Sequence, residues 1–305
     1  MTSSKLQEIV GYFKGLQDSI CAGLEGLDGK GKFREDLWIR ADGGGGRTRI
    51  IENGAVFEKG GVNFSHVHGR MPDVITQKLG LGEGLHFDAS GVSIVLHPHS
   101  PRVPIVHFNV RYFQMEDGTN WFGGGMDLTP IYVEKEDAHH FHSVLKATCD
   151  RFSPEYYPKF KAWCDRYFYI KHRKEMRGVG GLFFDHLKSK TMEEVEQYFQ
   201  FVQGVGDAFL KAYLPIASRR IHEPFGEKEK AFQLFRRSRY VEFNLVYDRG
   251  TKFGLDTGGR IESILMSMPP LASWTYNYQP EPHSKEAETI ALLQARDWVN
   301  ASANS

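Results

Sequence analysis

The chain has 305 residues, of which 41% are hydrophobic and 13% aromatic, so it is long enough for one large domain or two modest ones. Its 38 basic and 38 acidic residues cancel to a formal net charge of zero, which argues against general attraction to nucleic acid or a membrane surface. An anionic ligand would have to be held by locally placed arginines. No apolar run reaches the length of a transmembrane segment, so none is expected.

The N-terminus and the cysteines indicate the compartment. The first residues lack a secretory apolar region and a small-residue cleavage site. The three cysteines, Cys21, Cys149 and Cys164, are odd in number, far apart and without a CxxC pair. This usage is typical of inert thiols in a reducing compartment. We therefore expect a cytoplasmic protein.

The first part of the chain predicts a helix followed by a loop and strands. Apolar residues at helical spacing predict an N-terminal helix over residues 5–25. The glycines at 43–46 predict a glycine-rich surface loop over about 41–47, with a substrate-covering lid as the alternative. Alternating polarity between turn residues then predicts four strands. These strands are Ile50–Lys59, Val92–His97, Ile105–Phe113 and Trp121–Thr129.

The second part begins with helical periodicity and returns to strands. Helices are predicted over Glu136–Asp150 and Pro154–Lys174, and Thr191 with Glu194 forms a capping-box signature for a third. Strands are predicted at Tyr240–Tyr247 and Thr251–Asp256, joined by a turn at 248–250. A final helix is expected to begin at the cap Ser284 and to run through Trp298.

This order of elements predicts the fold class. Strands cluster, helices cluster, and strands then return, which favours an α+β fold over a doubly wound parallel sheet. We expect a large, mainly antiparallel β-sheet flanked by helices on both faces. The chain shows neither repeats nor a linker, so we expect a single domain over residues 1–305.

One predicted strand carries an unusual polar face. Between Ile105 and Phe113, apolar residues alternate with His107, Asn109 and Arg111. His107 can exchange protons near neutral pH, and Arg111 offers a planar fork for a carboxylate. In register, Ser93 and His97 of the preceding strand would share this face. The alternative is that these polar groups satisfy one another at a water-exposed sheet surface.

Two glycine segments are further candidates. The glycines at 123–125 remove side chains just before Asp127, so a large group could approach the backbone and Asp127 could accept hydrogen bonds from ligand N–H groups. The alternative is a bulge with Asp127 capping the next turn. Gly258 and Gly259 follow a predicted hairpin strand and precede Arg260, so their N–H groups could face an anion. The alternative is a simple turn with a solvated arginine.

Four histidines raise the question of a metal. His97, His107, His142 and His172 could together bind a transition metal, but their spacing matches no local ligand motif. His142 and His172 fall on apolar helix stripes, where a hydrogen-bonded core histidine is more common. The chain also lacks a nucleophile elbow, a Walker A motif and a dinucleotide fingerprint. An enzyme of this kind would use positioning and acid–base groups on a reactive substrate.

Longer motifs carry a resemblance to a known family. The chain strongly resembles the oxygen-dependent coproporphyrinogen III oxidases, the aerobic enzymes of haem synthesis. The matching segments are GGVNFSHVHG (60–69), HFNVRYF (107–113), WFGGGMDLTP (121–130), FYIKHRKEMRGVGGLFFD (168–185), FQLFRRSRYVEFNLVYDRGTKFGLDTGGR (232–260) and ESILMSMPP (262–270).

The resemblance implies a reaction and an assembly. Members of that family convert two propionates of coproporphyrinogen III into vinyl groups and so form protoporphyrinogen IX. Molecular oxygen is the oxidant, carbon dioxide and hydrogen peroxide leave, and no organic cofactor is used. The family fold is a large antiparallel sheet between helices. Members assemble as homodimers, and the region from Tyr240 to Thr275 matches the part tied to dimerisation.

The resemblance also implies roles for individual residues. The catalytic positions are His107 as proton donor, Arg111 and Asp127. The substrate-binding positions are Ser93, Asn109, Val110, Arg111, Gly258, Gly259 and Arg260. The positions of a metal site assigned to bacterial members are His97, His107, His142 and His172. Other members work without metal, so a divalent ion such as manganese is left open.

These roles give a hypothesis for the chemistry. Asp127 would hold the pyrrole nitrogens and help to remove a proton, oxygen would react directly with the electron-rich pyrrole, and Arg111 would orient the departing carboxylate. Three alternatives stay open at this point. They are a metal-dependent oxidase with a four-histidine site, a non-catalytic tetrapyrrole-binding protein, and a purely structural protein.

Overall fold

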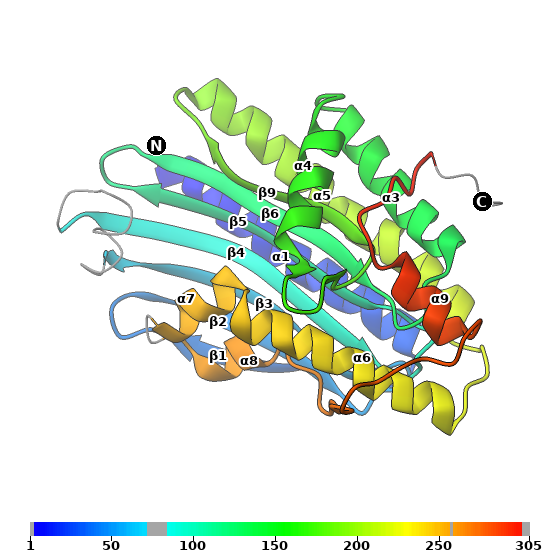
Figure 1. Cartoon of the computed structure of the whole chain (residues 1–305). Coiled ribbons are helices and arrows are strands. Elements are labelled where there is room, and N and C mark those ends of the chain that lie inside the picture. Colours follow the sequence, from blue (N-terminus) through cyan, green and yellow to red (C-terminus); the bar gives the residue numbers. More distant parts are fainter. Residues whose placement is uncertain (1–2, 72–83, 257–258, 301–305) are drawn as a thin grey trace.

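A seven-stranded antiparallel sheet organises the computed structural model of the chain (Figure 1), which describes residues 3–71, 84–256 and 259–300. Strands that follow one another in the chain pair with one another, and the last strand adds beside β6, so the order is β1-β2-β3-β4-β5-β6-β9. The strands are β1 (Arg34–Ile39), β2 (Gly44–Glu52), β3 (Phe57–Arg70), β4 (His86–Pro98), β5 (Ile105–Met115), β6 (Asn120–Thr129) and β9 (Gly180–Lys188). A separate small hairpin pairs β7 (Tyr169–Ile170) with β8 (Glu175–Met176).

Helices cover both faces of the sheet, as predicted (Figure 1). Helices α1 (Ser3–Asp28) and α5 (Met192–Arg220) pack on one face, and α6 (Glu227–Val246) lies on the other. Helix α3 (Lys135–Asp150) packs against α5, and α4 (Tyr156–Tyr167) packs against β9. The shorter helices are α7 (Arg249–Asp256), α8 (Ile261–Leu265) and α9 (Lys285–Leu292). The predicted α+β class is confirmed.

The alternation in β5 divides the two faces of the sheet. Val106 and Phe108 are fully buried in the main core, and the Phe108 ring lies 5.3 Å from the ring of Phe209 in α5. Burial of each such side chain is worth roughly 1.5–3 kcal/mol, so this face sets the orientation of the strand. The opposite face, called the site face below, bears His107, Asn109 and Arg111.

The strands predicted near the C-terminus are wrong. Tyr240–Tyr247 continues α6, and Thr251–Asp256 belongs to α7. Buried residues recur at helical spacing from Phe232 to Phe243, so packing against the sheet overrides the local β-propensity of the valine- and aromatic-rich segment. Of the predicted turn at 248–250, only Asp248 lies in the break between the two helices, and Arg249 and Gly250 begin α7. The Asp248 carboxylate accepts a hydrogen bond from the Thr251 backbone N–H at 2.7 Å.

The predicted glycine-rich loop is also wrong. From Gly44 onward this segment is strand β2, and Gly46 lies opposite Ser65 of β3. A Cβ atom on Gly46 would overlap the indole ring of Trp38, which lies beside it on β1. The glycine is therefore explained by close packing of an aromatic ring on a strand.

The remaining boundaries are mostly close to prediction. Helix α1 covers the predicted range, Thr191 and Glu194 form the capping box of α5, and the Ser284 hydroxyl caps α9. Three segments are shorter or broken. Helix α4 ends at residue 167 instead of 174, α9 ends at 292 instead of 298, and the strand predicted over 50–59 turns at residues 53–56 between β2 and β3.

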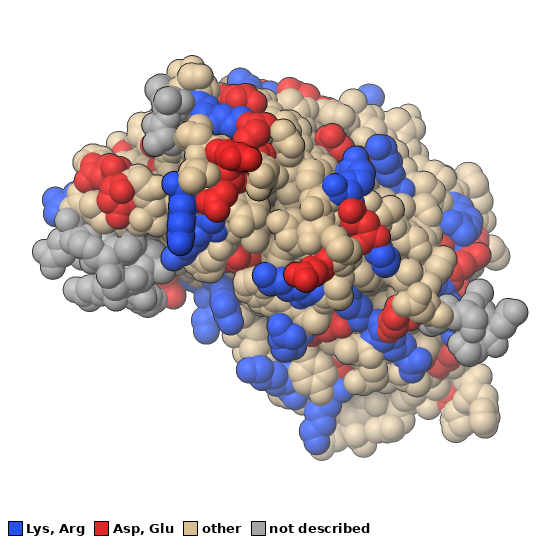
Figure 2. All heavy atoms as spheres, turned by 90° about the horizontal axis from the view of Figure 1, so that it is seen from above, with Lys and Arg blue, Asp and Glu red and all other residues tan. Residues whose placement is uncertain are grey.

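The distribution of charged side chains on the surface agrees with the net charge of zero. Figure 2 shows basic and acidic side chains interspersed over much of the face seen from above. Within the described residues, no helix is both long and apolar enough to cross a bilayer.

Candidate active site

A buried ion pair stands behind the predicted proton donor. The His107 Nδ1 atom lies 2.7 Å from Asp127 Oδ1, and the Arg177 Nη2 atom donates to Asp127 Oδ2 at 2.7 Å. The Asp127 residue is only 1% exposed. Burial by itself would raise the pKa of this carboxyl, but the Arg177 charge and the His107 hydrogen bond outweigh it and lower the pKa below its ordinary value. Asp127 is therefore held ionised, with both oxygens occupied.

Arg177 is itself fixed by its surroundings. The centre of its guanidinium lies 4.1 Å from the Phe168 ring centroid, 4.6 Å from that of Tyr240 and 4.8 Å from that of Phe243. Its Nη1 atom donates to the Asn244 side chain at 2.8 Å. Aromatic faces attract a desolvated cation, so α6 and the end of α4 together build the cavity for this charge.

From His107 the network continues along β5. Asn109 Nδ2 lies 3.3 Å from His107 Nε2, and Arg111 Nη1 donates to Asn109 Oδ1 at 2.6 Å. The Arg111 Nη2 atom forms an ion pair with Asp185 Oδ2 at 2.8 Å. The sequence therefore correctly places His107, Asn109, Arg111 and Asp127 together, in one continuous row of polar contacts.

The glycine run makes room for this row. Gly123 lies opposite Arg111, and a Cβ atom there would come within 2.9 Å of the Arg111 guanidinium and 2.5 Å of the Asp185 carboxylate. Side-chain atoms therefore do lie close to the bare backbone of Gly123, as expected. At this position they belong to the ion pair between Arg111 and Asp185 and not to a ligand.

The site face is open at its centre. Ser93, opposite Asn109 on β4, is exposed although β4 is a central strand of the sheet. The side chain of His107 is 19% exposed and that of Arg111 is 38% exposed. The polar residues do satisfy one another, as the alternative interpretation supposed. A purely solvated surface would not need a buried carboxylate, because burying a charge costs free energy. The burial of Asp127 between a histidine and an arginine therefore favours a functional site.

The other residues predicted to bind substrate do not lie together at the centre of the site face. The Val110 side chain is fully buried on the opposite face, and Gly258 lies outside the described residues. The Gly259 N–H donates to the Gly254 carbonyl at 2.8 Å, so it closes the end of α7 instead of facing an anion. Arg260 forms an ion pair with Asp36 of β1 at 2.5 Å. Strand β1 is four strand spacings from β5, which places this arginine about 19 Å along the sheet from Asn109.

Arg177 and Asp185 were missed by sequence reasoning. A lone buried aspartate requires a cationic partner, so Asp127 signalled that such a residue exists. Nothing in the periodicity pointed to Arg177, because it follows a two-residue strand and lies fifty positions from Asp127.

The histidines predicted as metal ligands have separate partners. His97 and His142 are fully buried. The His97 Nε2 atom contacts the Ser267 carbonyl at 2.9 Å, and His142 contacts the Tyr157 hydroxyl at 2.9 Å and the Val179 carbonyl at 3.0 Å. The prediction of a hydrogen-bonded core histidine is thus confirmed for His142.

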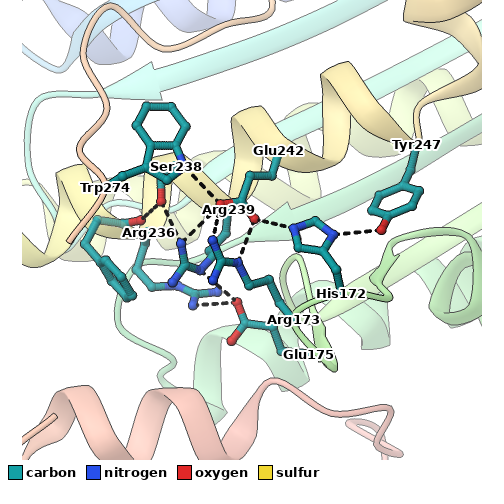
Figure 3. A network of polar contacts seen from close by, with 10 residues as sticks. His172, Arg173, Glu175, Arg236, Ser238, Arg239, Glu242, Tyr247 and Trp274 are labelled. Carbon is teal, nitrogen blue, oxygen red and sulfur yellow. Dashed lines mark hydrogen bonds and ion pairs between the residues drawn. The ribbon is translucent and has the colours of Figure 1, made fainter. Parts of the chain in front are cut away.

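His172 does not lie on a helix stripe, because α4 ends before it. It projects from the turn between β7 and β8, where its ring nitrogens contact Glu242 and the Tyr247 hydroxyl of α6, each at 2.7 Å (Figure 3). Glu242 also binds Arg173 and the Trp274 indole N–H. Among the residues that the structure describes, no group of three or more His, Cys, Asp or Glu could hold a metal ion. The four histidines do not fit a shared metal site.

Removal of metal is therefore expected to leave turnover unchanged. The protein would be treated with a chelator, dialysed, and assayed beside untreated enzyme, with its metal content measured by elemental analysis. An activity that falls with the loss of bound metal and returns on adding manganese would contradict this expectation.

The buried histidines are expected to make stability depend on pH. Burial lowers the pKa of His97 and of His142 to about 3 in the folded chain, whereas in the unfolded chain the usual value is about 6.5. Between these values the unfolded state binds more protons, so the free energy of unfolding falls as pH falls below about 6.5, by about 1.4 kcal/mol per pH unit for each histidine.

Urea unfolding at pH 7.5, 6.5 and 5.5 measures this slope before most carboxylates titrate. His142→Gln should reduce the slope, whereas His139→Gln, which changes an exposed histidine on the same helix, should not. A stability that is flat from pH 6.5 to 5.5 would contradict the assigned neutral states.

Two surface hollows lie away from this site. One of about 470 Å³ lies between α1 and α5, and one of about 750 Å³ is lined by residues near the starts of α3, α6 and α9. Neither includes the hydrogen-bonded row on the site face.

The comparison with known families agrees with the motifs. A family model described as coproporphyrinogen III oxidase matches residues 8–298. This family acts in haem biosynthesis and its members are oxidoreductases. The match covers nearly the whole chain, including every described residue of the polar row. The chain belongs to the coproporphyrinogen III oxidase family.

Proposed function

We propose that the protein is the oxygen-dependent enzyme that converts two propionates of coproporphyrinogen III into vinyl groups, giving protoporphyrinogen IX. For each propionate, the chain –CH2–CH2–COO⁻ with O2 and one proton becomes –CH=CH2 with CO2 and H2O2. One hydrogen of the carbon next to the ring passes to oxygen with its two bonding electrons, the electrons of the broken carbon–carbon bond form the vinyl double bond, and the added proton completes H2O2. The observation that carries the proposal is an oriented His107 on an open sheet face, four residues from Arg111 and on the same side of β5.

The stoichiometry requires a proton donor, and His107 has the geometry for this role. Its Nδ1–H donates to the ionised Asp127, which leaves Nε2, beside Asn109, as the atom that exchanges protons. We assign Asp127 to the orientation of His107. Direct contact with a pyrrole N–H, as hypothesised from the sequence, would require this carboxylate, which is only 1% exposed, to become accessible.

The arginines of the site face suit a substrate with several carboxylates. Arg111 lies on the same face as His107, with Asn109 between them, and would orient the propionate that reacts, since a planar guanidinium holds a carboxylate in a fixed direction. Arg260, at the far edge of the same face, would hold a distant propionate. Both arginines already bind an aspartate, which keeps them in place before the substrate arrives.

We further propose a homodimer in the cytoplasm, without an organic cofactor. Edge strand β1 exposes Leu37 at 70% and Ile39 at 91%, and Phe253 and Ile261 are also exposed in the region matched to dimerisation. An exposed apolar edge strand favours pairing with another chain. The free, buried state of all three cysteines supports a reducing compartment.

One assay tests the reaction directly. Purified protein is incubated with coproporphyrinogen III in air and under argon, the products are oxidised, and the porphyrins are separated. The proposal predicts vinyl products, CO2 and H2O2 in air only. Binding without vinyl product would indicate the tetrapyrrole carrier, and vinyl product under argon would refute the use of oxygen. Lack of porphyrin binding would favour a purely structural role.

A further inference from the structure

A row of aromatic rings crosses four strands at the outer end of the site face. The rings of Phe87 and Phe113 are stacked, with centroids 5.7 Å apart and an interplanar angle of 8°. Phe113 stacks on Trp121 at 4.2 Å and 25°, and Trp121 lies 5.3 Å from the ring of His186. Phe87, Phe113 and Trp121 are all only partly buried. These four residues, called the aromatic row below, lie on β4, β5, β6 and β9.

Strand register joins the aromatic row to the active site. Phe113 lies two residues beyond Arg111 on β5, so it projects from the same face at about 7 Å along the strand. On β6, Gly123 is opposite Arg111 and Trp121 is opposite Phe113. On β4, the residues opposite Arg111 and Phe113 are Gly91 and Ala89. The positions opposite the arginine on both neighbouring strands are therefore glycines, and the side chain that approaches it from β9 is that of Asp185.

The position of α6 leaves the aromatic row at the other end of the face. The rings of α6 pack on Val95, which is opposite His107, and on Ile105, which lies two residues further from the aromatic row. A row of aromatic rings that served packing alone would be expected beneath such a helix, because exposing large apolar groups is costly. The outermost ring is instead approached by a cation, since the Arg40 guanidinium lies 5.9 Å from the Phe87 centroid.

We propose that the aromatic row is a second part of the tetrapyrrole site, on which a pyrrole ring that is not reacting stacks while Arg111 holds the reacting propionate. This inference rests on the proposed function. A pyrrole presents a flat π face, and offset stacking of aromatic rings contributes about 0.5–1.5 kcal/mol beyond the area that it buries. The row would therefore help to set the orientation of the macrocycle over His107, and so which propionate meets it.

The test compares two variants of one residue. Trp121→Leu removes the ring and keeps an apolar side chain, whereas Trp121→Phe keeps a ring. Binding of coproporphyrin III, the stable oxidised form of the substrate, is measured by equilibrium dialysis, and kcat and KM are measured with coproporphyrinogen III. We expect Trp121→Leu to weaken binding and raise KM about tenfold, with kcat within about threefold of wild type. The Kd and KM of Trp121→Phe should stay within about threefold of the wild-type values.

Two controls separate stacking from folding. Tyr278→Leu removes a ring whose centroid lies 4.1 Å from that of Phe235 of α6, in a cluster that contains none of the aromatic row, and should leave Kd and KM unchanged. If Trp121→Leu does not give a folded protein by circular dichroism, Phe87→Leu, at the outer end of the row, provides the same comparison.

The outcomes are distinct. A folded leucine variant with unchanged Kd and KM, or one in which only kcat falls, overturns the aromatic row as a binding surface. A wild-type enzyme that binds coproporphyrin III but forms no vinyl product refutes the proposed function. In that case the binding comparison between the two Trp121 variants still decides whether the row contacts the ring.

Discussion

Replacing His107 with alanine is expected to lower kcat about 100- to 10,000-fold, the usual contribution of a positioned general acid. The substitution removes the only imidazole that contacts Asp127 among the described residues, and it leaves Arg111 and its ion pair with Asp185 in place. KM should therefore change much less than kcat. The measurement is steady-state formation of vinyl product from coproporphyrinogen III, with far-UV circular dichroism to confirm the fold.

Two further variants test whether that loss of kcat comes from His107 itself and from its orientation by Asp127. His139→Gln changes an exposed histidine outside the site face and should keep full activity. Asp127→Asn keeps the shape of the side chain but removes the charge that orients His107. It should lower kcat as well. Near-normal turnover with unchanged substrate affinity in Asp127→Asn would end the role assigned to this carboxylate.

Replacing Arg177 with methionine is expected to destabilise the protein by about 3–5 kcal/mol, because it leaves the charge of Asp127 buried without its partner. Both side chains of this pair are only 2% exposed. Without the guanidinium the pKa of Asp127 should rise, so the orientation of His107 should also weaken and kcat should fall. Urea unfolding followed by fluorescence measures the first effect, and the kinetic assay measures the second.

The double variant Arg177→Met with Asp127→Asn supplies the matched control. If the cost comes from an unpaired buried charge, neutralising Asp127 should recover a substantial part of the lost stability without restoring activity. Stability losses that simply add in the double variant would show that Arg177 contributes through its ring contacts and not through the carboxylate.

The buried pair also bears on how an imidazole can be oriented beside an open surface. In the proposed role His107 must reach substrate, so it cannot be fully enclosed, and its side chain is 19% exposed. Asp127 and Arg177 restrict it from behind, within a shell of Phe168, Tyr240 and Phe243. The proposed proton transfer from His107 depends on such positioning.

Much of the site was predictable because it is local. Two-residue alternation in β5 determines that His107, Asn109 and Arg111 share a face, and pairing with β4 and β6 follows from chain order. Helix α1 and the caps of α5 and α9 are likewise set by short-range patterns. Only at the level of family resemblance did the sequence supply a substrate.

The tertiary structure alone decided the rest. The partner of Asp127 lies fifty residues away, and His172 meets Glu242 seventy residues away, so no periodicity could reveal either contact. Residues 240–246 have the composition of a strand, but they form the end of a helix because the sheet offers a surface for their buried stripe. Local patterns determine which face a side chain takes, whereas the packing of distant segments determines what that side chain meets, because contacts between distant segments depend on the whole fold.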